Sequence, residues 1–187
     1  MNKAIFLDRD GTLIKDRGHI NDVKDIVFYD STFDCLRELQ KEYLLFIITN
    51  QPGVAKGTIE RSNLEMIHAY ILQKMSDNGI EIKAIYCCTH SKEERCQCRK
   101  PNTFFIDIAR KEYSIDIKNS FVIGDHPSDA ELAIKSHANG IFLLTGHGRK
   151  HFKELNYPDT SNIMICRNLK SATRKILDIT NKPILVP

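Results

Sequence analysis

Short apolar runs alternate with longer segments of helical periodicity along the chain. Runs of three to five apolar residues between turn-forming residues are typical of buried strands, because a helix needs a longer stretch to cover a core. The sequence therefore predicts strands at 4–7, 44–48, 82–86, 121–123 and 141–144, and a weaker strand at 163–166.

Between these runs, apolar residues recur at the spacing of an amphipathic helix. Ser31 is placed to cap one helix, and a longer helix follows Thr58 and closes at Asn78-Gly79. Further helices are expected at 102–113, 127–136 and 169–179, with an irregular tail at 181–187.

Strands that alternate with helices imply a parallel sheet with helices on both faces, since right-handed crossovers place them there. The predicted fold class is α/β, with a Rossmann-like sheet in one domain spanning residues 1–187. A composition of 42% hydrophobic and 27% charged residues is ordinary for a single core. Ligands of such sheets bind beyond the carboxyl ends of the strands, so the residues that follow each strand carry the functional information.

Charge and hydropathy exclude several classes of partner. The net charge is +3, from 27 basic and 24 acidic residues, and the basic residues are scattered, so nucleic acid is not expected. The longest apolar run, 44–48, is far shorter than the roughly 20 residues that cross a bilayer, and no signal-peptide core is visible. We expect a cytoplasmic monomer that acts on a small molecule.

The first predicted strand leads into Asp8-Arg9-Asp10-Gly11-Thr12, with two carboxylates two residues apart. One carboxylate can attack a phosphoryl group while the other exchanges protons with the leaving oxygen and with water. An acidic turn is the simpler alternative. A calcium loop is excluded, because its sixth position needs glycine and its twelfth needs glutamate, and Leu13 and His19 stand there.

Two other predicted strands end in polar residues. Thr49-Asn50-Gln51-Pro52-Gly53 offers a hydroxyl and an amide for a phosphoryl oxygen, although as a pattern by itself it is more often a plain turn. Asp125 follows the fourth strand, with Asp129 one helical turn later, and Asp125 would supply a magnesium ligand. Helix capping is the alternative for this acidic segment.

Four of the six cysteines crowd between Cys87 and Cys98, together with His90. Thiolates and imidazole at this spacing favour a closed zinc site over a disulfide framework. The predicted ligands are Cys88, His90, Cys96 and Cys98; Cys88 is preferred to its neighbour because its spacing to His90 mirrors that of Cys96 to Cys98. The basic pair Arg99-Lys100 follows at once, so the metal would fix where these charges point.

Taken together, these clusters favour phosphoryl transfer. Attack of a carboxylate on a phosphate dianion needs a hard divalent cation and a fixed ammonium nearby, and the clusters supply both. The motifs resemble those of the haloacid dehalogenase superfamily, and the zinc loop followed by Arg-Lys-Pro is similar to that of its heptose bisphosphate phosphatase and histidinol-phosphatase branch. The motifs that carry the resemblance are Asp8–Thr12, Thr49-Asn50, Lys100 and Gly124-Asp125 with Asp129.

The resemblance implies a role for each matching residue. Asp8 would be the nucleophile and Asp10 the general acid and base, with Thr49 and Lys100 stabilising the phosphoryl group. Magnesium would be held by the side chains of Asp8 and Asp125 and by the backbone carbonyl of Asp10, with Asp129 in an outer shell. Substrate contacts are expected at Asp16, Arg17, Gly18, His19, Asn50, Arg99 and His126.

The spacing of the motifs leaves no room for a separate cap domain. His126 stands where the family often has lysine, and Pro52 replaces a serine. The basic, glycine-rich segment 145–151 is favoured as a solvated loop over a second anion contact.

The expected function is that of a phosphatase that contains magnesium and zinc. The first choice of substrate is D-glycero-D-manno-heptose 1,7-bisphosphate. Histidinol phosphate or another phosphomonoester is the alternative substrate. A phosphotransferase, and a non-catalytic binding module organised by zinc, are the alternative functions.

Overall fold

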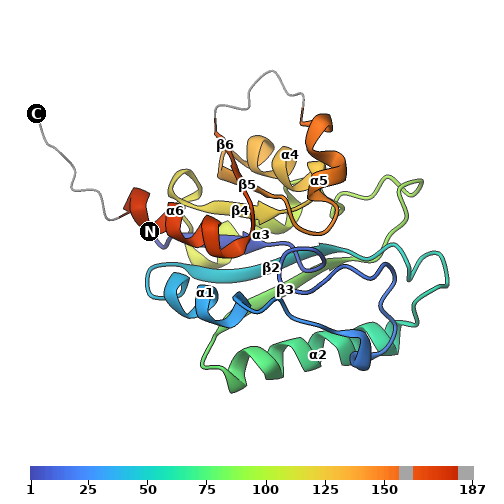
Figure 1. The fold of residues 1–187 in the computed structure, drawn as a ribbon. Helices are drawn as coiled ribbons and strands as arrows, with labels where there is room; N and C mark the ends of the chain where they lie inside the picture. Colours follow the sequence, from blue (N-terminus) through green and yellow to red (C-terminus); the bar gives the residue numbers. More distant parts are fainter. Residues whose placement is uncertain (156–161, 181–187) are drawn as a thin grey trace, which may run out of the picture.

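A six-stranded, fully parallel sheet forms the centre of the protein (Figure 1). The computed structural model describes residues 1–155 and 162–180, so the predicted tail at 181–187 lies outside the described residues. Strand order is β3-β2-β1-β4-β5-β6, which places the first and fourth strands side by side at the centre. The predicted strands are confirmed as β1 (Ala4–Leu7), β2 (Leu44–Asn50), β3 (Ile82–Cys88), β4 (Phe121–Gly124), β5 (Asn139–Leu143) and β6 (Ile163–Cys166).

Helices cover both faces of the sheet, as expected, because alternate residues of the central strands need apolar cover on opposite sides. Ile5 and Leu7 of β1 face one buried cluster, whereas Ala4 and Phe6 face the other. The first cluster includes α1 (Thr32–Leu39), α2 (Arg61–Asp77) and α6 (Leu169–Thr180); the second includes α3 (Phe104–Tyr113) and α4 (Pro127–Ser136). The shorter helices are α5 (Gly148–His151), η1 (Val23–Asp25), η2 (Ile117–Asn119) and η3 (Phe152–Glu154).

One helix start differs from the sequence-based expectation. Helix α3 begins at Phe104 rather than at residue 102, after a cis Lys100-Pro101 bond and a turn. The long helix α2 follows Thr58 as expected and begins at Arg61; the hydroxyl of Thr58 is engaged with His19 Nδ1 at 2.7 Å and with the carbonyl of Gly53. Ser31 occupies the N-cap of α1, but its side chain makes no cap hydrogen bond there.

All five helices of eight residues or more in the described chain contribute buried residues to the two core clusters, and none builds a separate cap domain. No helix in the described part of the chain is long and apolar enough to cross a membrane. Within the described residues, the carboxyl edge of the sheet is bordered by the loops that leave it and by the short helix α5.

Candidate active site

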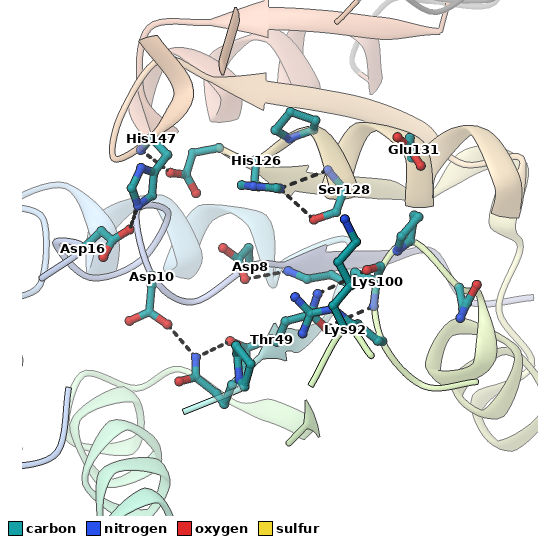
Figure 2. Close-up of a pocket in the computed structure, with 18 of the residues that line it drawn as sticks. Asp8, Asp10, Asp16, Thr49, Lys92, Lys100, His126, Ser128, Glu131 and His147 are labelled. Atoms are coloured by element: carbon teal, nitrogen blue, oxygen red, sulfur yellow. Dashed lines mark hydrogen bonds and ion pairs between the residues drawn. The ribbon is translucent and has the colours of Figure 1, made fainter. Parts of the chain in front are cut away.

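Polar side chains gather where β1, β2 and β4 end, because neighbouring parallel strands present their carboxyl ends at one edge. Asp8 follows β1, Thr49 and Asn50 end β2, and Asp125 follows β4. These residues line a cleft of about 850 Å³ (Figure 2), to which the loop after β3 contributes Arg99 and Lys100.

Lys100 joins two carboxylates at the base of the cleft. Its Nζ lies 2.6 Å from Asp8 Oδ1 and 2.7 Å from Asp129 Oδ1, and it also donates to the carbonyl of Ile48. Burial by itself lowers the pKa of Lys100, but Asp129 and Asp8 reverse this effect and the pKa is raised. Lys100 therefore remains a fixed ammonium beside Asp8.

Asp8, Asp125 and Asp129 bring their carboxylate oxygens within 4.8 Å of one another. Burial, followed by repulsion from Asp8 and Asp129, raises the pKa of Asp125 to about 8. Burial is also the largest cause of the raised pKa of Asp8. Three carboxyl groups, two of them buried, converge beside one ammonium, and hard oxygen donors of this kind fit a magnesium ion.

Three glycines leave room for the side chains of Asp125 and Asp129. A β-carbon on Gly11 or on Gly146 would lie 2.2 Å from Asp125 Oδ2, and both glycines have positive φ. A β-carbon on Gly124 would lie 2.1 Å from Asp129 Oδ2. The backbone thus approaches the carboxylates more closely than any other residue type allows.

Asp10 is held by two hydrogen bonds to one of its carboxylate oxygens. Its Oδ2 accepts hydrogen bonds from Arg9 Nε at 2.9 Å and from Gln51 Nε2 at 2.8 Å. Gln51 Nε2 also donates to Thr49 Oγ1 at 2.8 Å. Burial is the largest cause of the raised pKa of Asp10.

Asn50 holds the segment that carries Lys100. Its Oδ1 accepts from the backbone N–H of Lys100 at 3.0 Å, and its Nδ2 donates to the Lys100 carbonyl at 3.2 Å. The side chain predicted to contact substrate thus anchors the backbone of the ammonium-bearing residue; its contact with substrate stays a prediction.

Cys88, His90, Cys96 and Cys98 form the second group of possible metal ligands, with ligand atoms within 4.8 Å of one another. Cys88 Sγ lies 3.5 Å from Cys96 Sγ, and Cys98 Sγ lies 3.3 Å from His90 Nδ1. Cys87 is not a member of the group, because adjacent residues of β3 point to opposite faces of the sheet. Three thiols and one imidazole converging in this way fit zinc.

The residues predicted to contact substrate are distributed around the cleft. Asp16, Gly18, His19, Arg99 and His126 line it, whereas Arg17 of the same turn does not. The predicted role of Arg17 remains a prediction without support from this geometry. The imidazole of His126 accepts from the backbone N–H of Ser128 and so caps α4, whereas Asp125, for which capping was the alternative interpretation, is not the N-cap residue.

Four further residues belong to the site although the sequence did not single them out: Arg9, Gln51, His68 and His147. His147 belongs to the segment 145–151, which was favoured as a solvated loop; its N–H donates to Asp125 Oδ2 and its Nε2 lies 2.7 Å from Asp16 Oδ2 (Figure 2). Gln51 stood inside a recognised motif, and the glycine beside His147 marked a close approach. His68 lies in the middle of a helix and carried no local signal.

Known sequences resemble this chain over most of its length. A family profile described as HAD-hydrolase-like matches residues 97–172. The D-glycero-alpha-D-manno-heptose-1,7-bisphosphate 7-phosphatase of Campylobacter jejuni is 37% identical over 143 residues, 76% of this chain and 82% of that protein. The D-glycero-beta-D-manno-heptose-1,7-bisphosphate 7-phosphatase of Helicobacter pylori J99 is 36% identical, over 77% of this chain and 84% of that protein.

Known structures share the fold as well. The D,D-heptose 1,7-bisphosphate phosphatase of B. bronchiseptica, crystallised with magnesium and phosphate, superposes with a TM-score of 0.85 and 27% identity. The match covers 95% of this chain and 99% of that one.

Proposed function

Because this chain belongs to the haloacid dehalogenase-like hydrolases and is a phosphoric monoester hydrolase, we propose that it works through an aspartyl-phosphate on Asp8 with magnesium. The first choice of substrate is D-glycero-D-manno-heptose 1,7-bisphosphate. A non-catalytic binding module organised by zinc is set aside, since the relatives that define the family are named as phosphatases.

The observation that carries the mechanism is the convergence of Asp8, Asp125 and Asp129 around Lys100 in an open cleft. A carboxylate nucleophile needs a nearby cation to approach a phosphate dianion. Lys100 supplies one positive charge at 2.6 Å from Asp8, and the three carboxylates leave room in the charge balance for a second cation.

In the proposed reaction, a carboxylate oxygen of Asp8 attacks phosphorus and the bond to the ester oxygen breaks. The leaving oxygen takes a proton from Asp10, whose pKa is raised chiefly by burial. Water then attacks the phosphorus of the aspartyl-phosphate and gives a proton to Asp10, which restores Asp8 and releases phosphate. Lys100 and Thr49 stabilise the charge on the phosphoryl oxygens.

The side chains of Asp8 and Asp125 and the backbone carbonyl of Asp10 would hold magnesium, with Asp129 in an outer shell. Bound there, the ion would offset the repulsion between the carboxylates and the phosphate dianion and polarise a phosphoryl oxygen. Zinc would occupy the separate thiol and imidazole group and act on the structure of the loop.

The substrate proposal rests on the names of the relatives and on the charge of the cleft. A bisphosphate carries a second anion that must be held away from the reacting one. Arg99 lines the cleft on the zinc-binding loop, and a guanidinium can bind a phosphate through two parallel hydrogen bonds.

The test compares kcat/KM for the α and β anomers of the heptose bisphosphate, histidinol phosphate and a simple sugar monophosphate. We expect a heptose bisphosphate to be the best substrate, and Arg99→Ala to raise its KM about tenfold with little effect on the monophosphate. Arg110→Ala, an exposed arginine on α3 outside the cleft, is the matched control.

If the wild type shows no preference for either anomer over the monophosphate, the heptose assignment is wrong and only the phosphatase class stands. Inorganic phosphate released in equal amount to the substrate consumed separates hydrolysis from transfer to another acceptor.

A further inference from the structure

Arg9 is the largest fully buried side chain among the described residues, at 0% exposure. A buried guanidinium is unfavourable unless its donors find partners. Its Nε donates to Asp10 Oδ2, and its Nη2 lies 2.8 Å from the same oxygen, close enough for an ion pair but not aligned for a hydrogen bond. Arg9 therefore contacts only one carboxylate oxygen of Asp10, Oδ2.

The other oxygen, Asp10 Oδ1, is buried and has no hydrogen-bond partner within the described part of the chain. Asp10 lines the cleft, with 16% of its side chain exposed. Because Arg9 and Gln51 both bind Oδ2, they fix the rotation of the carboxyl group at the cleft.

Arg9 is held in turn by a residue that approaches from α2. His68 Nε2 lies 3.4 Å from Arg9 Nη1. Arginine has only donors, so Nε2 must accept and the imidazole proton must sit on Nδ1. Burial, and then the charge of Arg9, lower the pKa of His68 to about 4, so the ring is neutral at physiological pH.

A neutral acceptor suits this position better than a charged one. A carboxylate at position 68 would compete with Asp10 for the guanidinium, and an apolar side chain would leave Nη1 buried without a partner. Imidazole satisfies the donor and leaves the positive charge of Arg9 directed at Asp10.

We propose that His68 is a positioning residue that acts through Arg9 to hold the carboxyl group of Asp10 in place for proton transfer to the ester oxygen of the substrate. The inference rests on the proposed role of Asp10 as general acid and base. Neither His68 nor Arg9 needs to touch the substrate. Loss of His68 should therefore weaken proton transfer and leave substrate binding intact.

The experiment compares His68→Leu, which removes the acceptor, with His68→Gln, which keeps one. Gln73→Leu is the control, an exposed polar-to-apolar change on the same helix. Each variant is assayed with p-nitrophenyl phosphate, whose leaving group needs little protonation, and with an alkyl phosphate, whose leaving group needs a proton. Melting curves confirm that each variant is folded.

We expect His68→Leu to lower kcat for the alkyl phosphate about tenfold or more, to lower it much less for p-nitrophenyl phosphate, and to change KM less than twofold. His68→Gln should recover most of the activity. In an Asp10→Asn background, His68→Leu should add almost nothing, because both changes remove one function.

The outcomes separate this inference from the proposed mechanism. If Asp10→Asn shows no dependence on the leaving group, the proposed role of Asp10 is wrong. If Asp10→Asn shows that dependence while His68→Leu lowers both rates equally, or multiplies the loss in the Asp10→Asn background, His68 has only a structural role and the inference is overturned.

Discussion

Asp8 and Lys100 are 92 residues apart in the sequence and 2.6 Å apart in the structure. At the scale of single residues, the site depends on such pairs: each buried charge has an opposite charge or a donor beside it. An unpaired charge at this depth would be strongly unfavourable. The residues that carry the proposed chemistry and those that hold one another in place are therefore the same few side chains.

Asp8→Asn should abolish turnover, because an amide cannot form the aspartyl-phosphate that divides the reaction into two steps. We expect kcat to fall by about 10⁴-fold or more, measured as phosphate release at saturating substrate. The melting temperature serves as the control for folding. Activity within tenfold of wild type would contradict the mechanism.

His68 should also make the protein sensitive to acid. Its pKa is lowered from 6.5 to about 4 in the folded protein, so below pH 6.5 the unfolded chain binds a proton that the folded chain rejects. Stability is therefore lost as the pH falls from 6.5 toward 4. Between pH 7 and pH 5 the wild type should lose about 1–2 kcal/mol more unfolding free energy than His68→Gln.

The measurement is urea unfolding of both proteins at several pH values. Subtracting the two curves removes the titration of the carboxylates, which both proteins share. If the unfolding free energies of the two proteins change equally with pH, the pKa of His68 is not lowered in the folded protein.

At the scale of elements, the loop between β3 and α3 links the zinc-binding group to the catalytic cleft. Cys98 precedes Lys100 by two residues, and Asn102 donates to the carbonyl of Cys96 at 2.9 Å. The four ligands lie on this loop and on the end of β3. A metal bound there would restrict the backbone that places Arg99 and Lys100.

Replacing Cys96 by serine should release zinc and reduce kcat/KM by about tenfold or more while Asp8 stays in place, because a structural zinc contributes folding energy directly to the segment that binds it. Cys87→Ser is the matched control, since Cys87 is adjacent to a ligand but outside the group. Elemental analysis of both variants and of wild type measures the metal. Elemental analysis that finds no zinc in freshly purified wild-type protein would contradict the zinc assignment.

At the scale of the whole molecule, two apolar layers pack against the faces of the sheet, and its carboxyl edge brings three carboxyl groups together. Their mutual repulsion opposes folding. The fold is therefore expected to gain stability from any cation that enters the site.

Magnesium at a hundredfold excess over its Kd should stabilise the protein by about 2.7 kcal/mol, or raise the melting temperature by roughly 5–10 °C. Asp125→Asn should reverse the pattern: it melts at or above the wild-type temperature without magnesium, because an amide avoids the cost of burying a carboxyl group whose pKa is raised to about 8, and it gains little when magnesium is added. Zinc content is checked in each sample so that the two ions are not confused. An equal magnesium shift in both proteins would show that the ion binds elsewhere.

The sequence by itself determined the strands, the α/β class and the residues at the strand ends, because apolar periodicity and turn-forming residues act over a few positions. It also favoured Cys88 over Cys87, since the spacing of Cys88 to His90 mirrors that of Cys96 to Cys98. It placed the start of α3 two residues too early, because the turn after the cis Lys100-Pro101 bond delays the helix to Phe104.

Only the tertiary structure decided how the site is held. Asn50 anchors the backbone of Lys100, and His147 donates to Asp125. His68 contacts Arg9 at Nη1, a nitrogen that Arg9 does not use to contact Asp10. Each of these contacts joins segments that are distant in sequence, and the local sequence around His68 does not indicate its role. The parallel sheet and its crossover helices bring such residues together. The catalytic residues can therefore be predicted from motifs, whereas the residues that hold them in place depend on the fold.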